Sequence, residues 1–426
     1  MRRRNHIEKS GHSSFRPWAV RGNTNRPEVA CIRQRESDKD DGLIENEKAV
    51  KGIFLLVFFL IYGGVHLYLF LGARASLALG TRSSVLLALF MGIMVVAPLI
   101  VHAAERYGLE PLAHFFAWTG YIWMGFAFLL FCLSLIFDCY RLLAHVGAYI
   151  FSFDSFSIIP HARCRFLTMI SLAALLALYG SFEALRIHTE TLTIKTAKIP
   201  REIGTFRIVQ ISDLHLGLIV REKRLERVLR EIRAAAPDML VSTGDLVDGE
   251  TNNLSVLADL LREIQPAYGK FAVTGNHEFY AGLDQSLAFT KRAGFTVLRG
   301  ETADVGGFLT VAGIDDPTAR IYRARVGRPE KELLEGQTGS PFTLLLKHQP
   351  VPSPAPFDLQ LSGHTHKGQL FPFTLITRLV FPCNSGRYDL SNGGTLYVSK
   401  GSGTWGPPMR LMAPPEITVI DVMNSG

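Results

Sequence analysis

The fold of the C-terminal part is decided by an apolar run that ends in an aspartate and a histidine: Phe206-Arg-Ile-Val-Gln-Ile-Ser-Asp213-Leu-His215. Its Val- and Ile-rich portion predicts a strand buried on both faces, because a strand with one wet face would alternate apolar and polar residues. Similar runs alternate with helical patterns, which indicates an α/β domain. The predicted strands are 206–212, 239–243, 271–274, 310–314, 342–346, 359–362 and 396–399, and the predicted helices are 221–235, 253–264 and 284–293.

Metal-binding residue types follow five of these strands. The five groups are Asp213-Leu-His215, Gly244-Asp245-Leu-Val-Asp248, Gly275-Asn276-His277-Glu278, Lys347-His348 and Gly363-His364-Thr-His366. Strand ends of an α/β sheet gather at one edge, so these side chains are expected to meet. A glycine precedes three of the groups, as expected where the backbone turns tightly beside an ion.

The donor set predicts two divalent cations. A carboxylate can bridge two metals while imidazoles and an amide oxygen complete their coordination, and the absence of cysteine ligands favours Mn, Fe or Zn over Ca. Two cations about 4 Å apart can lower the pKa of water toward 7 and hold both oxygens of an in-line displacement at phosphorus. A lone D-x-H is more often a loop than a site, but five such groups in order are not accidental.

These motifs resemble the calcineurin-like metallophosphoesterase superfamily, whose D-x-H, GD-x-x-D, GNHE, lone His and GH-x-H pattern is matched in full. The stretches 312–317, 348–350, 361–366 and 397–410 are similar to the YkuE-like branch, which includes transmembrane proteins with a metallophosphoesterase domain. The likeness covers about residues 190–422 and implies a two-sheet β-sandwich flanked by helices.

The resemblance also implies a role for each matching residue. Asp213, His215 and His366 would hold the first metal, Asp245 would bridge, and Asn276, His348 and His364 would complete the second, with Mn favoured. His277 would protonate the leaving group or steady the phosphoryl oxygens. Gly249 stands where protein Ser/Thr phosphatases have Arg, which argues against phosphoprotein substrates. Lys367 and Arg410 are predicted substrate-binding residues, with solvent exposure as the favoured alternative for Lys367.

Four N-terminal stretches without Asp, Glu, Lys or Arg predict membrane spans: 53–71, 83–103, 112–137 and 166–182. Each is long enough to cross a hydrocarbon core of about 30 Å. The segment 142–153 is apolar but short, and we expect it to lie at the interface or re-enter rather than form a fifth span. Residues 1–52 are expected to form a disordered arm and 187–426 the metallophosphoesterase domain.

Charge distribution gives the expected orientation. Ten Lys and Arg residues flank the spans on the side of both termini and five on the other side, which predicts a plasma or inner membrane protein with a cytoplasmic catalytic domain. Residues 187–426 carry 26 Lys and Arg against 25 Asp and Glu, so a nucleic-acid partner is not expected. The five cysteines have no C-x-x-C spacing and form neither a disulfide framework nor a thiolate zinc site.

Apolar segments beside the motifs, 216–220, 370–373 and 405–409, are interpreted either as packing under the sheet or as a rim for lipid. Helix 221–235 is rich in arginine and could lie against anionic lipid or in solvent.

The sequence therefore predicts a membrane-attached dimetal enzyme that cleaves a phosphodiester or pyrophosphate, in contact with membrane lipids. Some relatives of this branch are linked to cleavage of UDP-2,3-diacylglucosamine in lipid A synthesis, which implies a lipid-linked substrate. The alternatives are a soluble nucleotide or phosphodiester hydrolase, and a non-catalytic membrane scaffold.

Overall fold

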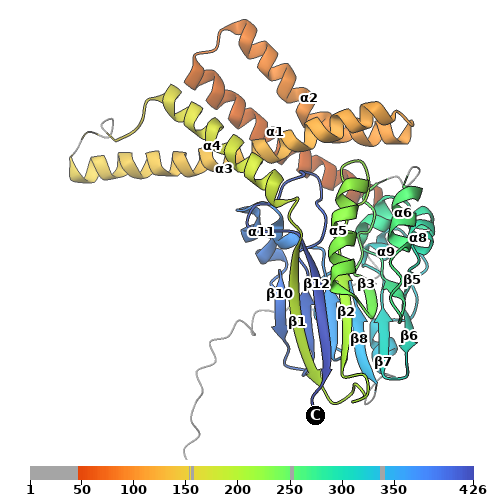
Figure 1. The fold of residues 1–426 in the computed structure, drawn as a ribbon. Helices are drawn as coiled ribbons and strands as arrows, with labels where there is room; N and C mark the ends of the chain where they lie inside the picture. Colours follow the sequence, from red (N-terminus) through yellow and green to blue (C-terminus); the bar gives the residue numbers. More distant parts are fainter. Residues whose placement is uncertain (1–46, 153, 155–157, 250–253, 336–340) are drawn as a thin grey trace, which may run out of the picture.

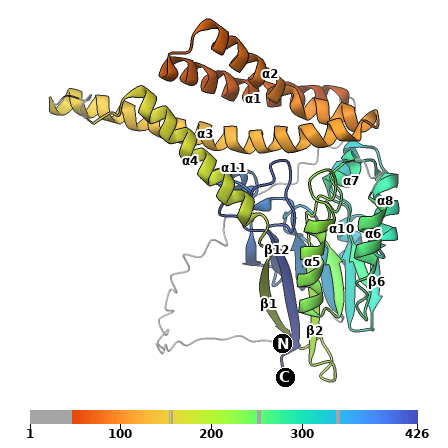
Figure 2. The same ribbon diagram turned by 45° about the horizontal axis from the view of Figure 1, so that its top comes forward.

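Four long helices lie over one end of an α/β sandwich in the computed structural model (Figures 1 and 2). The structure describes residues 47–152, 154, 158–249, 254–335 and 341–426. The predicted arm therefore lies outside the described residues, except for its last part, 47–52, which begins the first helix.

The four helices correspond to the four predicted spans. They are α1 Glu47–Leu77, α2 Thr81–Arg106, α3 Glu110–Phe151 and α4 Ala162–Glu183. Each is long and apolar enough to cross a membrane, as judged by length and composition. Their apolar residues point outward in large number, as expected of helices whose surroundings are hydrocarbon.

The segment 142–151 is part of α3, which continues without interruption to Phe151, and the expectation that it lies at the membrane interface or re-enters stays a prediction. At 1.5 Å per residue its 42 residues extend about 63 Å, roughly twice the ~30 Å hydrocarbon core. Asp138 and Arg141 follow the predicted span 112–137, and in the structure both belong to α3. Asp138 accepts a hydrogen bond of 2.6 Å from Tyr68 of α1 and pairs with Arg141 at 3.2 Å, so neither charge needs to end the helix.

The sandwich consists of two mixed six-stranded sheets, which confirms the expected fold. The first sheet has the order β1-β12-β2-β3-β4-β5 and the second β10-β11-β9-β8-β7-β6. The strands are β1 His188–Thr196, β2 Thr205–Ile211, β3 Met239–Ser242, β4 Lys270–Ala272, β5 Thr296–Val297, β6 Glu301–Val305, β7 Leu309–Gly313, β8 Phe342–Leu346, β9 Leu359–Ser362, β10 Gly386–Asp389, β11 Thr395–Val398 and β12 Glu416–Asn424.

All seven predicted strands are present, displaced by at most two residues. Five others were missed: β5, β6 and β10 are short or polar, the edge strand β1 is polar along much of its length, and β12 was overlooked despite its apolar run. β12 runs antiparallel to β2 and parallel to β1, so the end of the chain ties the edge of the first sheet to its centre.

Three layers of apolar contact hold the sandwich. Phe206, Met239 and Leu344 belong to the core between the two sheets. The helices α5 Glu222–Ala235, α6 Ser255–Arg262 and α8 Leu283–Arg292, which match the three predicted helices, cover the outer face of the first sheet. α10 Glu330–Glu335 packs Leu333 and Leu334 on the second sheet.

The helix layer is docked on the sandwich through the loops at its upper end (Figure 2). Leu370, Met409 and Leu411 form one buried cluster with residues of α1, α2, α3 and α4. Gly125 of α3 makes room for this contact, since a Cβ there would lie 2.8 Å from Met409 Sδ. The Arg410 backbone N–H donates to the Gly180 carbonyl of α4 at 2.9 Å.

This docking decides between the two interpretations of the apolar segments. Leu216 and Val220 pack in the domain core. Leu370 and Met409 are buried against the long helices. Phe371 and Trp405 remain 40% and 53% exposed. The apolar loops therefore join the domain to the helices and leave a smaller exposed apolar margin beside that joint.

Candidate metal centre

The predicted metal ligands come together at the strand ends beneath the helix layer. β2, β3, β8 and β9 each deliver one group, and a short helix after β4, α7 Asn276–Tyr280, delivers Asn276 and His277. His366 begins the 3-10 turn η4, His366–Gly368. The sheet edge thus assembles residues separated by more than 150 positions, because parallel strands bring their carboxyl ends to the same place.

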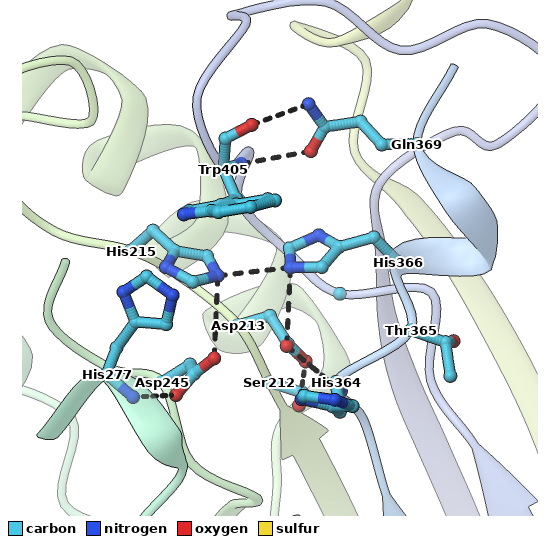
Figure 3. Close-up of polar contacts among 12 residues, drawn as sticks. Ser212, Asp213, His215, Asp245, His277, His364, Thr365, His366, Gln369 and Trp405 are labelled. Carbon is cyan, nitrogen blue, oxygen red and sulfur yellow. Dashed lines mark hydrogen bonds and ion pairs between the residues drawn. The ribbon is translucent and has the colours of Figure 1, made fainter. Parts of the chain in front are cut away.

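The first cluster contains Asp213, His215 and His366 (Figure 3). The Nε2 atoms of the two histidines lie 3.0 Å apart, and His366 Nε2 lies 3.4 Å from Asp213 Oδ1. All three side chains are buried. This is the first-metal set that the family resemblance implied.

The second cluster contains Asn276, His348 and His364. His348 Nε2 lies 3.2 Å from Asn276 Oδ1 and 3.1 Å from His364 Nδ1. His348 Nδ1 is held at 2.8 Å from the Thr243 carbonyl, which leaves Nε2 to face the cluster. His348 is fully buried and His364 partly so.

Asp245 lies between the two clusters. Its Oδ2 is 3.8 Å from His215 Nε2 and 3.2 Å from His348 Nε2, so one oxygen faces a histidine of each cluster. Burial alone would raise the pKa of Asp245, but the neighbouring His348, His277 and His215 hold that pKa well below its ordinary value. The carboxylate is therefore ionised, and it faces a histidine of each cluster.

The donor set fits two cations. Nitrogen and oxygen lone pairs converge within 4.8 Å of one another in each of three His/Asp groups, two of which correspond to the predicted sets. Imidazole, carboxylate and amide donors together suit Mn, Fe or Zn. These clusters are consistent with a dimetal site.

His277 lies beside both clusters. Its Nδ1 is 3.1 Å from Asp248 Oδ1, and its backbone N–H donates to Asp245 Oδ1 at 2.8 Å. Burial lowers the pKa of His277, but the Asp245 and Asp248 carboxylates outweigh this effect and raise it to about 9. His277 can also form a ligand group with His215 and Asp245, so geometry permits it a place at the metal as well as a proton-donating role.

Backbone conformation is unusual at these residues. Asp213, His215, Asp245, His364 and His366 all have φ between 49° and 72°, in the left-handed region that non-glycine residues rarely adopt. Such strain costs about 1–3 kcal/mol per residue and is characteristic of functional sites. The sequence had suggested that the preceding glycines make the turns, but among them only Gly244 has a positive φ.

The other two glycines provide space. A Cβ on Gly275 would overlap the Asp245 carboxylate, and one on Gly363 would overlap Ser212 and Asp213. These two glycines allow their backbone to lie close to the carboxylates of Asp245 and Asp213, and a side chain at either position would prevent that approach.

Two acidic residues of the motifs, Glu278 and Asp248, have no role predicted from the sequence. Glu278 accepts hydrogen bonds from the backbone N–H groups of Gly275, Asp245 and Leu246 at 2.6–3.0 Å, and so joins the second motif to the third. Asp248 contacts Nδ1 of both His215 and His277, at 3.3 and 3.1 Å. Both lie inside the recognised motifs, so their position in those motifs was the available signal.

The two predicted substrate-binding residues occupy other positions. Arg410 is 0% exposed, and its guanidinium donates to the carbonyls of Gly403, His366, Lys400 and Ala413 and contacts His366 Nδ1 at 3.0 Å. Its donors are thus used within the protein, and it orients His366 instead of reaching a substrate. Lys367 is half-buried with φ 52°, and burial together with Lys400 and Arg378 lowers its pKa, although Glu416 and Glu183 act in the opposite direction.

Residues of the helix layer and its joint cover the centre. Trp405 lies over His215 and His366, its ring centroid 6.0 Å from that of His277, and two hydrogen bonds with Gln369 fix its backbone (Figure 3). Glu105 of α2 reaches the second motif, since its Oε1 lies 3.1 Å from where a Cβ of Gly249 would stand. The centre is thus bounded by the domain and by the long helices.

Comparison with known proteins agrees with this geometry. Residues 206–368 match the calcineurin-like phosphoesterase family. An uncharacterized metallophosphoesterase of Aquifex aeolicus is 44% identical over 261 residues, which cover 60% of this chain and 99% of that protein. A transmembrane protein with metallophosphoesterase domain from Danio rerio is 33% identical and covers 58% of this chain and 60% of its own. The uncharacterized metallophosphoesterase YkuE of Bacillus subtilis is 33% identical, over 56% of this chain and 86% of its own.

Replacing the bridging carboxylate tests the paired arrangement. Asp245→Asn should weaken both metals together, by at least about tenfold in affinity, because groups that merely orient ligands already contribute that much. Metal content is measured by elemental mass spectrometry on the purified protein, with the exposed Asp284→Asn as the matched control. Retention of two metals per chain in Asp245→Asn would contradict the bridge.

Proposed function

We propose, on the premise that this chain belongs to the calcineurin-like metallophosphoesterase family, that it hydrolyses a phosphodiester or pyrophosphate bond at a membrane surface. The single observation that carries the activity is the pair of buried His/Asp clusters joined by Asp245. The membrane attachment is supported by the four long apolar helices and by relatives that are named transmembrane proteins.

Asp213, His215, Asp245 and His366 would hold one cation, and Asp245, Asn276, His348 and His364 the other, with Mn as the metal to supply first. When bound, the pair would supply Lewis acidity and an activated water for attack at phosphorus. Glu278 keeps the second and third motifs together, and Arg410 fixes the His366 ring, so the chain preorganises the ligands before substrate arrives.

His277 would act on the leaving group. Because its Nδ1 faces Asp248, Nε2 is the nitrogen free to give a proton to the departing oxygen. A pKa of about 9 keeps the ring protonated at neutral pH, and bound cations would draw that value down toward the range useful for proton transfer.

An amphiphilic substrate is supported by the surroundings of the centre. The half-exposed Trp405 lies over the histidines. Phe371 and Phe373 are about 40% exposed, and the Phe373 ring lies 6.2 Å from that of Phe128 in α3. The neighbouring helix α11, Phe373–Val380, exposes Leu375, Ile376, Leu379 and Val380. An apolar margin continuous with membrane helices suits a ligand that carries acyl chains. UDP-2,3-diacylglucosamine is the first substrate that we propose.

A soluble nucleotide is the second candidate, because the Trp405 indole could equally stack on a base. The two candidates differ in whether acyl chains contribute to catalysis. A non-catalytic scaffold is the third, and hydrolysis of any phosphoester by the purified protein would exclude it.

The proposed activity is tested with a generic phosphodiester. Purified Mn-loaded protein should hydrolyse bis-p-nitrophenyl phosphate, and His277→Ala should lose about 10²–10⁴-fold in kcat because a positioned acid contributes that much. His277→Ala should keep both metals by elemental analysis, and the exposed His188→Ala is the matched control. Full hydrolysis after exhaustive chelation would refute a metal-dependent activity, and loss of metal in His277→Ala would make this histidine a ligand.

The lipid substrate is tested by removing the acyl chains. In detergent micelles, kcat/KM for UDP-2,3-diacylglucosamine should exceed that for its deacylated form at least tenfold, since burial of a single CH₂ is worth about 0.8 kcal/mol. Phe371→Ser should reduce this preference, whereas Val256→Ser, an exposed apolar residue of α6, should not. Equal kcat/KM for the two substrates would exclude the lipid and favour a soluble phosphodiester.

The proposed orientation places the catalytic domain in the cytoplasm, following the ten-to-five distribution of Lys and Arg around the spans. A reporter fused after Gly426 should therefore give cytoplasmic fluorescence and no alkaline phosphatase activity when expressed in a Gram-negative bacterium. The same reporters fused within 72–82 should give the opposite pattern. Phosphatase activity from the fusion after Gly426 would reverse the topology.

A further inference from the structure

A buried arginine without a partner lies outside the metal centre. Arg224, in the first turn of α5, is only 8% exposed. Its Nε and Nη2 are fully enclosed and make no hydrogen bond, and no described residue accepts one from any of its guanidinium nitrogens. A buried guanidinium is ordinarily paired, because removing its charge from water is costly.

The charges around Arg224 increase this cost. Burial and then the neighbouring Arg410 and Arg227, both positive, lower the pKa of Arg224 to about 9. Arg410 already gives its donors to backbone carbonyls and His366. The acidic ligands of the metal centre are not among the groups that act on Arg224. Among the described residues, the charged groups that act on Arg224 are both positive, and its Nε and Nη2 donors are unused.

Its place in the fold is the joint between domain and helices. Arg227, one turn further along α5, donates through Nη1 to the Leu185 carbonyl just after α4, at 3.2 Å. Arg410 is tied to Gly180 of α4 through its backbone. The upper end of α5 accordingly lies next to the end of α4 and the loop that joins β11 to β12 (Figures 1 and 2). If α4 spans the bilayer, this joint lies at the level of the lipid headgroups.

We propose that Arg224, with Arg227 beside it, forms a phosphate-binding site at the joint between α5 and α4, separate from the metal centre. Nη1 is the guanidinium nitrogen of Arg224 that is not enclosed, so a phosphate would reach Arg224 there, and the exposed Arg227 adds a second positive charge to the same anion. The phosphate could be that of an anionic lipid headgroup or free phosphate. In either case the bound anion would compensate Arg224 and link the domain to its helices.

The site is tested by thermal unfolding of the full chain in neutral detergent with excess chelator, so that the metal centre takes no phosphate. The probes are inorganic phosphate, dioctanoyl phosphatidic acid and dioctanoylglycerol. Phosphatidic acid should raise the Tm of the wild type and of Arg230→Met, an exposed arginine of the same helix. Arg224→Met should lose the shift, with at least a tenfold weaker apparent Kd. Without ligand it should be as stable as the wild type or more so, because an uncompensated charge has been removed.

The outcomes are distinct. A shift with phosphatidic acid alone identifies a lipid site, and equal shifts with inorganic phosphate identify a site for the free anion. Arg224→Lys keeps the charge but replaces the guanidinium by an ammonium group, and it should bind about tenfold more weakly, which keeps the test available if Arg224→Met does not fold. An unchanged shift in Arg224→Met or Arg224→Lys, or an equal response to dioctanoylglycerol, would overturn the proposal.

Discussion

The ionised carboxylate of Asp245, held between two histidine clusters in a buried site, is the constraint on which the site depends. One oxygen faces His215 and His348, and the other accepts the backbone N–H of His277. A buried carboxylate is tolerated only where positive or donating groups surround it. Glu278 holds the backbone on either side of it, and Gly275 leaves the space that it occupies. Substituting any of these groups would expose or displace the charge that two cations are expected to share.

The second organising feature is the placement of the metal centre under the long helices. Met409 and Leu370 are buried against the helices, whereas Trp405 extends over the histidines and Glu105 of α2 approaches the second motif. A detached catalytic domain would lose these contacts and expose a large apolar surface. The helices therefore contribute to the boundary of the site as well as providing an anchor, which is a physical reason to expect a substrate that is itself at the membrane.

Two buried arginines lie at the same joint and differ in how their charges are compensated. Arg410 gives its donors to carbonyl oxygens and to His366, so its charge is spread over many dipoles. Arg224 has none of these acceptors. These two buried arginines therefore differ in what their charges need. The first stabilises the ligand set from within, and the second needs an anion from outside the described chain.

The sequence by itself determined the four apolar helices, seven of the strands and the residues that meet at the candidate metal centre, because uncharged runs of bilayer length, Val- and Ile-rich runs, and D-x-H or GNHE groups are local patterns. It did not show that α3 continues past Asp138, whose carboxylate accepts a hydrogen bond from Tyr68 of another helix. It did not show that Arg410 is a buried residue rather than a substrate contact. It also did not show that Leu370 and Met409 pack against the long helices rather than line a rim for lipid. Burial and hydrogen-bond partners arise from segments far apart in the chain, so only the tertiary structure decided which charges are compensated and which apolar loops are covered.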